Sequence, residues 1–277
     1  MIHQQRVAVV LPAYNAARTL ERTCRAIPTG VVDDLILVDD ASQDTTVAVA
    51  QQLGLRGYRH AVNRGYGASQ KTGYQAALDR GADIVVMLHP DNQYPAELVP
   101  ALASAVASGV YHIVLGSRLL GTGAIQRGMP RYKHLCNRLW TWGQNLALRQ
   151  HLSEYHTGFR AFSRSFLLRV PLLENSDDFL FDNQLLVQAI AFGYAIGEFS
   201  APARFTEESS SISPWRGIRY GVGILGVTGQ YLLDRAGLLH ARLFDPVGRR
   251  LSDTRIPAEP LAPEPIPALD AGDISRP

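Results

Sequence analysis

The sequence has few cysteines, few lysines and little net charge. Cys24 and Cys136 are the two cysteines of the 277 residues; their spacing suggests neither a metal motif nor a disulfide framework, and we expect both to be buried or inert thiols. The net charge of +2 argues against a strongly basic nucleic-acid-binding protein. Lys71 and Lys133 are the only lysines, so arginine supplies most of the positive charge. Arginine suits phosphate and carboxylate groups, although codon bias would explain the same preference.

Long apolar runs are also absent. Residues 1–5 lack the basic and apolar regions of a secretion signal, and no stretch reaches the roughly 18 apolar residues of a spanning helix. We therefore expect a cytoplasmic protein, and any membrane contact would be peripheral, at the inner face. A hydrophobic content of 46% with 19% charged residues is typical of a globular protein with a sizeable core.

Short apolar runs alternate with helical patterns in the first part of the chain. The runs are residues 6–11, 35–38, 84–88 and 112–115, and the helical patterns are residues 16–27, 45–53, 68–80 and 95–108. This alternation predicts an α/β fold with a mostly parallel sheet and helices on both faces. In such sheets ligands bind beyond the carboxyl ends of the strands.

Polar side chains follow three of the predicted strands. "PAYN" follows the first, "DDASQDTT" the second, and "HPDNQ" the third, where His89, Asp91 and Gln93 occupy alternate positions. Because parallel strands end at one edge of a sheet, we expect these groups to meet there. Asp39 and Asp40, taken alone, are also typical of a solvated turn.

A glycine-rich segment, "NRGYGASQKTGYQAAL" at residues 63–78, surrounds the predicted start of a helix. Flexible backbone before a helix N-terminus can approach a phosphate closely, and a nearby cation would assist. Gly67 and Lys71 are therefore candidates for substrate binding. The segment matches neither the Walker pattern nor the dinucleotide fingerprint, so a tight structural loop is the alternative.

Six motifs, in order, resemble the inverting family 2 glycosyltransferases with the GT-A fold, closest to the dolichol- or polyprenyl-phosphate mannose synthase branch. They are "VVLPAYN", "LILVDDASQDTT", "NRGYGASQKTGYQAAL", "MLHPDNQYPAEL", "VLGSR" and "YHTGFRAFSR", and together they span about residues 6–205. The resemblance implies a Rossmann-like GT-A domain that binds a nucleotide-diphosphate sugar with a divalent cation, Mg²⁺ or Mn²⁺.

The resemblance also implies roles for individual residues. Asp91 falls on the second aspartate of the family's DxD metal motif, Gln93 on the glutamine that accompanies it, and Arg118 on a substrate-binding arginine. The positions that match nucleotide-binding residues are Pro12, Tyr14 and Asp39, with Asp40 beside them. A hard cation held by oxygen ligands would neutralise the leaving diphosphate.

The sequence departs from the family pattern at several of these positions. The first aspartate of DxD is His89, which could bind a softer metal, hydrogen-bond the diphosphate or only pack beside the strand. Ala16 replaces a glutamate. Glu208 and Pro214 replace two phosphate-gripping cations, for which Arg204, Arg216 and Arg219 could substitute. These changes put the donor and the acceptor in doubt.

The acceptor decides whether a catalytic base is needed. A hydroxyl of a saccharide or metabolite must lose a proton as it attacks, whereas a lipid phosphate arrives ionised. Glu154 and Asp182 are the two candidate bases, and Asp182 is equally a helix N-terminal carboxylate. His156 and Arg160 are expected in the same loop as Glu154.

We thus expect a glycosyltransferase domain at residues 1–205, a helical extension at 206–250 and a disordered, proline-rich tail at 251–277. The amphipathic pattern at 124–150 and the apolar stretch at 219–233 could lie in a membrane interface. The predicted activity is transfer, with inversion, to a polyprenyl phosphate or to a hydroxyl. A nucleotide-sugar-binding protein without catalysis is the alternative from another class.

Overall fold

The computed structural model describes residues 1–121, 123–205 and 214–261. Within them, one sheet of eight strands has the order β7-β5-β6-β4-β1-β2-β3-β8. The strands are β1 (Val7–Ala13), β2 (Asp34–Asp39), β3 (Arg56–Arg59), β4 (Ile84–Met87), β5 (Ile113–Ser117), β6 (Arg160–Ser163), β7 (Ile196–Ser200) and β8 (Glu259–Pro260).

The central strands run parallel, as predicted. Val9 of β1 is in register with Leu35 of β2 and Val86 of β4. One strand that the sequence did not predict, β6, lies antiparallel between β4 and β5, with Arg160 opposite both Met87 and Leu115. The start of β6 therefore lies between the carboxyl ends of β4 and β5, next to the segments that follow them.

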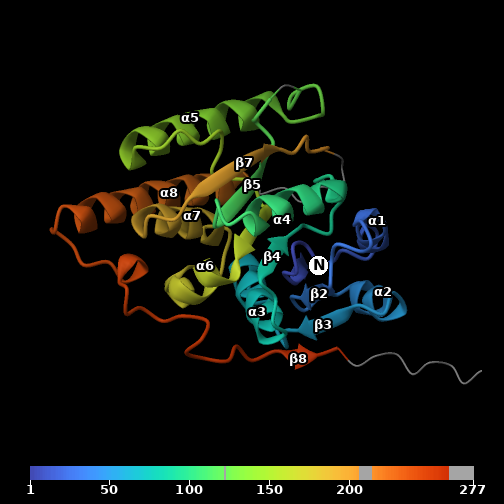
Figure 1. Ribbon diagram of the computed structural model, residues 1–277. Coiled ribbons are helices and arrows are strands. Elements are labelled where there is room, and N and C mark those ends of the chain that lie inside the picture. Colours follow the sequence, from blue (N-terminus) through green and yellow to red (C-terminus); the bar gives the residue numbers. More distant parts are fainter. Residues whose placement is uncertain (122, 206–213, 262–277) are drawn as a thin grey trace, which may run out of the picture.

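Helices cover both faces of the sheet, because alternate residues of each buried strand face opposite sides. One face packs against α1 (Leu20–Ala26), α2 (Thr46–Gln52) and α4 (Val99–Ala107), which the short helix η1 (Ala96–Leu98) precedes. The other packs against α3 (Tyr66–Asp79), α6 (Arg164–Arg169) and α7 (Phe181–Ala191). Figure 1 shows these two layers. The predicted α/β fold class is confirmed.

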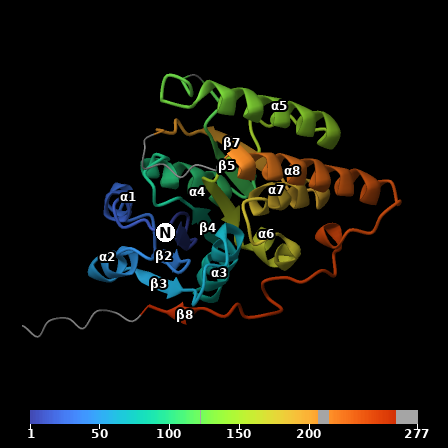
Figure 2. The same ribbon diagram turned by 180° about the vertical axis from the view of Figure 1, so that it is seen from behind.

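Two long helices lie side by side at one end of the molecule (Figures 1 and 2), and they are α5 (Arg131–Leu148) and α8 (Pro214–Arg235). Helix α5 lies within the amphipathic pattern at residues 124–150. Val227 and Tyr231 join α8 to the core that contains α3 and α7. Among the described residues, no helix is long and apolar enough to span a bilayer.

The segment from residue 251 to residue 261 is ordered, unlike the predicted tail. After the short helix η3 (Arg242–Phe244), Leu251 is only 3% exposed, and β8 pairs antiparallel with β3. The Gln75 side chain donates to the carbonyls of Leu251 (3.1 Å) and Thr254 (2.7 Å). The segment thus covers the edge strand, whose backbone groups would otherwise be unpaired. Residues 206–213 and 262–277 lie outside the described residues.

Candidate active site

The loops that follow β1 and β2 are held together by side chains. The backbone N–H of Asn15 donates to Ser42 Oγ (2.9 Å), and that of Ala16 donates to Thr46 Oγ1 (2.8 Å). Tyr14, the residue before Asn15, has half of its surface exposed. Because these bonds join residues that are close in sequence to the two strands, the local motifs largely determine this part of the site.

Asp39 ends β2 and is fully buried. Its Oδ2 accepts from the Ser42 N–H (3.2 Å) and lies 3.3 Å from Arg59 Nε. Its Oδ1 is buried and has no hydrogen-bond partner among the described residues. An unpaired buried acceptor costs about 1–3 kcal/mol, so this oxygen is suited to a ligand donor. Pro12, buried, lies opposite Val38 in the neighbouring strand.

Asp40 is used differently from its neighbour. Its carboxylate contacts His60 Nδ1 (2.7 Å) and accepts from the backbone N–H groups of Arg64 and Gly65 (2.8 Å each). These contacts hold the glycine-rich loop in place. Asp40 therefore has protein partners for both oxygens. It does not line the cavity that opens beyond the ends of β4 and β5.

Gly67 and Lys71 also make contacts within the protein. The Gly67 N–H donates to the Asp177 carbonyl (2.7 Å), and a Cβ on Gly67 would lie 2.5 Å from the Ser176 carbonyl oxygen. Lys71 Nζ donates to the Asn175 carbonyl (2.5 Å) and to Asp177 Oδ1 (2.7 Å), while burial lowers its pKa. Neither residue lines the cavity beyond β4 and β5. Their contacts are those of a tight structural loop, which was the alternative interpretation of this segment.

A cavity of about 640 Å³ opens beyond the ends of β4 and β5, bounded by α5 and α8. Its lining contains five predicted site residues: His89, Asp91, Gln93, Arg118 and Asp182. The lining also includes Met129, Cys136, Trp140, Phe179, Phe205 and Ile218. Cys136 is exposed, so of the two expectations, a buried or an inert thiol, the first is wrong for this residue.

Asp91 and Gln93 lie together in the loop after β4, with exposed fractions of 7% and 8%. The Gln93 N–H donates to Asp91 Oδ1 (3.0 Å), and the Arg204 N–H donates to the Gln93 carbonyl (2.8 Å). The Arg204 side chain lies at the surface. In the described parts of the chain, no three His, Cys, Asp or Glu side chains form a metal-binding group. A carboxylate and an amide oxygen nevertheless suit a hard cation that substrate phosphates also coordinate.

Three side chains form a hydrogen-bonded chain along the cavity. His89 Nε2 lies 2.9 Å from the Tyr66 hydroxyl, which donates to Asp182 Oδ2 (2.9 Å). Gln70 Nε2 donates to Asp182 Oδ1 (3.0 Å). Burial, reinforced by the charge of Asp182, raises the pKa of Tyr66 well above its usual value. Asp182 lies in the first turn of α7 and is 6% exposed.

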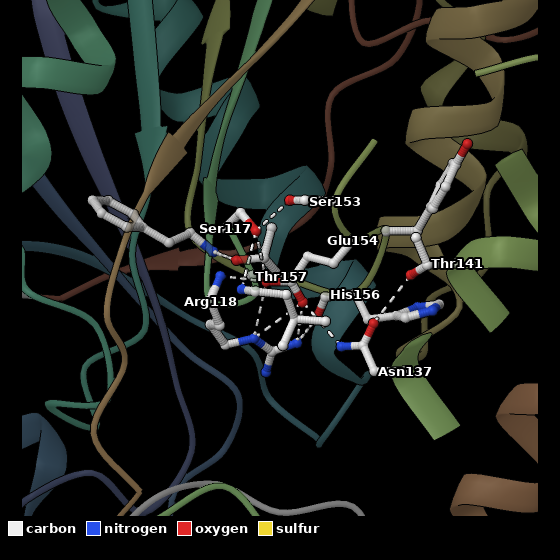
Figure 3. Close-up of polar contacts among 12 residues, drawn as sticks. Ser117, Arg118, Asn137, Thr141, Ser153, Glu154, His156 and Thr157 are labelled. Carbon is white, nitrogen blue, oxygen red and sulfur yellow. Dashed lines mark hydrogen bonds and ion pairs between the residues drawn. The ribbon is translucent and has the colours of Figure 1, made fainter. Parts of the chain in front are cut away.

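Arg118 and Glu154 form a buried ion pair (Figure 3). Glu154 is fully buried and accepts from Arg118 Nη2 (2.7 Å), the Arg118 N–H (2.5 Å) and Asn137 Nδ2 (3.0 Å). Burial disfavours the charged carboxylate, but these contacts outweigh it and lower the pKa of Glu154. Glu154 does not line the cavity. It instead holds the side chain of Arg118, which lines the cavity.

His156 and Arg160 lie in the same loop, as expected. Arg160 is fully buried and donates to the carbonyls of Thr157 (2.7 Å), Asp182 (2.6 Å) and Tyr155 (3.0 Å), which ties the loop to α7. His156 lines the cavity with Nδ1 3.0 Å from the Tyr220 hydroxyl. Burial lowers the pKa of His156 to about 3, so its ring is neutral at physiological pH.

Sequence reasoning missed several polar residues of the site, including Tyr66, Gln70, Asn137 and Tyr220. Tyr66 and Gln70 lie inside the glycine-rich motif that had been interpreted for its backbone and its lysine. Asn137 and Tyr220 lie on helices whose apolar residues dominated the pattern. No local signal marks them, because their partners come from distant segments of the chain.

Comparison with known proteins identifies the family. The model of glycosyl transferase family 2 matches residues 8–170, more than half of the chain. The chain belongs to this family. Its relatives include the polyprenol monophosphomannose synthase of Mycolicibacterium smegmatis, 29% identical over 84% of this chain and 90% of that protein. The undecaprenyl-phosphate mannosyltransferase of Micrococcus luteus is 26% identical over 86% and 99%.

Solved structures identify the fold. Glucosyl-3-phosphoglycerate synthase from Mycobacterium tuberculosis, in complex with UDP, superposes with a TM-score of 0.65 at 21% identity, covering 86% of this chain and 82% of that one. Together with the sheet order, this confirms the predicted GT-A fold.

Another relative, the glycosyltransferase AglD of Haloferax volcanii, is 30% identical over 70% of this chain, which spans only 32% of that protein.

Proposed function

We propose that this family 2 protein is a metal-assisted, inverting glycosyltransferase that moves a sugar from a nucleotide-diphosphate sugar to a lipid phosphate. The observation that carries the proposal is the cavity, whose lining combines polar residues that follow β4 and β5 with apolar side chains, among them Trp140 of α5 and Ile218 of α8. Such a cavity suits an acceptor with an anionic head and a hydrocarbon chain.

The donor would bind at the strand ends. Tyr14, Pro12 and the unpaired Oδ1 of Asp39 are suited to the nucleoside. Asp91 and Gln93 would hold a divalent cation, Mg²⁺ or Mn²⁺, which neutralises the leaving diphosphate when bound. The complex of the Mycobacterium tuberculosis synthase with Mn²⁺ and UDP-glucose, which has a TM-score of 0.61 to this chain, supports this choice of cofactor.

The acceptor would enter from a membrane surface. Two cavity-lining residues, Tyr132 and Ile218, are more than half exposed, so the cavity opens onto the surface of α5 and α8. We define the apolar stripe as the large exposed residues of this surface: Tyr132, Leu135, Leu139, Trp142 and Leu146 on α5, and Ile218, Val222 and Leu225 on α8. Helix α5 has three basic and no acidic residues. This surface suits a peripheral contact with anionic lipid at the inner face of the membrane.

A lipid phosphate needs no general base, because it attacks the anomeric carbon already ionised. Attack opposite the diphosphate would break the glycosidic bond in one in-line step and invert the configuration. Arg118 lines the cavity and has two carboxylate bonds that fix its guanidinium. It would attract the acceptor phosphate or the donor diphosphate.

A second candidate acceptor is a saccharide or metabolite hydroxyl. The specific observation in its favour is Asp182, a carboxylate that lines the cavity and is oriented by Tyr66 and Gln70. Such a carboxylate could take the proton of an attacking hydroxyl. With a lipid phosphate acceptor, Asp182 would instead accept a hydrogen bond from a hydroxyl of the donor sugar. Glu154 is the weaker candidate base, since both of its oxygens serve Arg118 and Asn137.

The experiment offers short-chain polyprenyl phosphate and hydroxyl acceptors side by side, with labelled UDP-, GDP-, dTDP- and CDP-sugars and either cation. Labelled lipid phosphate supports the proposal, and labelled hydroxyl acceptor alone overturns it in favour of the second candidate. Nucleotide binding by thermal shift without any transfer would favour a binding protein without catalysis.

A further inference from the structure

His89 occupies the place of the first aspartate of the metal motif, but its contacts are with aromatic residues. Its Nε2 lies 2.9 Å from the Tyr66 hydroxyl, and the two rings stack with centroids 5.3 Å apart. Tyr66 also stacks on Phe179, at 5.2 Å, and Tyr94 packs against His89, at 5.9 Å. The imidazole is thus fixed by packing on both sides.

The direction of the hydrogen bonds follows from Asp182. An ionised carboxylate can only accept, so the single proton of the Tyr66 hydroxyl goes to Asp182 Oδ2. The Tyr66 oxygen must then accept from His89 Nε2, which therefore carries a proton. A protonated ring nitrogen cannot bind a metal ion. Only Nδ1 of His89 is left for a cation.

Gly158 makes room for this arrangement. A Cβ at position 158 would lie 2.2 Å from His89 Nε2 and 3.2 Å from the Tyr66 hydroxyl. Any side chain there would displace the imidazole from Tyr66. The absence of a side chain at Gly158 therefore leaves the space in which the imidazole of His89 reaches Tyr66.

We propose that His89 is a positioning residue that acts through Tyr66 on Asp182. Tyr66 and Gln70 hold one oxygen each of the Asp182 carboxylate, whose other lone pairs remain for a substrate hydroxyl. The inference rests on the proposed function in one respect, that Asp182 touches the substrate there.

The first test needs no activity. In the full-length protein labelled with ¹⁵N-histidine, long-range ¹H–¹⁵N spectra report which ring nitrogen carries the proton. The His89 signals, assigned by their loss in the His89→Gln variant, should show a protonated Nε2 and a bare Nδ1. A proton on Nδ1 alone would overturn the inference even if no sugar transfer were found.

The second test is a double-mutant cycle on initial transfer rates. Tyr66→Phe removes the bridging hydroxyl but keeps the ring, and His89→Asp restores the acidic residue of the family motif without a proton to donate. Each change should lower kcat by about 10- to 100-fold through misplacement of Asp182, while KM for the nucleotide sugar changes by less than about threefold. The double variant should be no slower than the slower single variant by more than about twofold.

Conservative variants and a control complete the design. His89→Gln retains a donor that can reach Tyr66 and should recover part of kcat. Tyr194→Phe removes a hydroxyl from an aromatic cluster remote from the cavity and should leave kcat unchanged. Full activity of His89→Asp, as expected for exchange of one metal ligand for another, would refute the positioning role. The positioning role would also be refuted if the fold-losses of kcat in the two single variants multiplied in the double variant.

Discussion

The two halves of the candidate active site are built in different ways. The half proposed to bind the nucleotide consists of the loops after β1 and β2, and its hydrogen bonds join Asn15 and Ala16 to Ser42 and Thr46. The half proposed to bind the acceptor brings together Arg118, Asn137, Glu154, Asp182 and Tyr220, which lie in five separate segments. Local motifs can therefore specify the first half, whereas the second depends on how α5, β6, α7 and α8 pack.

The halves also differ in what covers them. Asp39 ends a strand inside the sheet, and its unpaired oxygen is enclosed by protein. The acceptor half faces α5 and α8, whose outer surface is apolar and exposed. The proposed function assigns the buried half to a soluble nucleotide sugar and the half next to α5 and α8 to a lipid acceptor.

The largest expected effect is on Asp91, which lines the cavity in the loop after β4. Asp91→Ala removes the carboxylate proposed to hold the cation, and kcat/KM should fall on the order of 10³-fold or more. Thermal unfolding without substrate should change little. Asp79→Ala, an exposed carboxylate at the end of α3, is the matched control and should retain full activity. Turnover that survives in Asp91→Ala and still depends on metal would assign the cation to other residues.

A second prediction tests whether packing sustains the acceptor half. Glu154→Gln leaves Arg118 without its buried counter-charge, and the free energy of unfolding should fall by about 3–5 kcal/mol. Because the pKa of Glu154 is lowered on folding, its stabilisation is present above the ordinary carboxyl pKa of about 4.3 and is lost as pH falls through the folded value.

Denaturant titrations from pH 7 down to pH 3 measure this pH dependence of the free energy of unfolding. The wild-type protein should lose stability on acidification more steeply than Glu154→Gln, so the difference between the two should narrow below about pH 4.3. Glu97→Gln, an exposed glutamate in η1, should follow the wild-type curve. Parallel curves for the wild-type protein and Glu154→Gln would show that the ion pair contributes nothing on folding.

The same contrast explains how much the sequence could predict. The strands β1, β2, β4 and β5 were evident as apolar runs, and their ends placed Asp39, Asp91 and Gln93 at one rim. The strand β6, "RAFS", has four residues without periodicity, and only its pairing with β4 and β5 makes it a strand. Gly67 and Lys71 resembled a phosphate loop because the sequence could not show that residues 175–177 occupy their hydrogen-bonding groups. Long-range packing, which no local pattern encodes, decides these cases.

The smallest expected effect concerns the apolar stripe and the membrane. Leu139, Trp142 and Leu146 belong to the stripe but do not line the cavity, and they are between 58% and 70% exposed. Replacing all three with serine should weaken partition into vesicles containing anionic lipid by roughly tenfold or more, because each loses buried hydrocarbon at the interface. Sedimentation with vesicles of phosphatidylglycerol and phosphatidylcholine measures the change.

The control variants distinguish vesicle binding by the apolar stripe from nonspecific hydrophobic adsorption. Serine at Val62, Val110 and Val247, which are exposed singly elsewhere, removes three apolar side chains and should leave partition unchanged. Binding of the wild-type protein should weaken with salt and with loss of the anionic lipid, because Arg131 and Arg138 lie beside the stripe. Transfer to a water-soluble, short-chain lipid phosphate should survive in the triple α5 variant, since its active site is intact. If the stripe instead joined two copies of the chain, the wild-type protein would be dimeric without vesicles and the triple variant monomeric, and the membrane contact would be refuted.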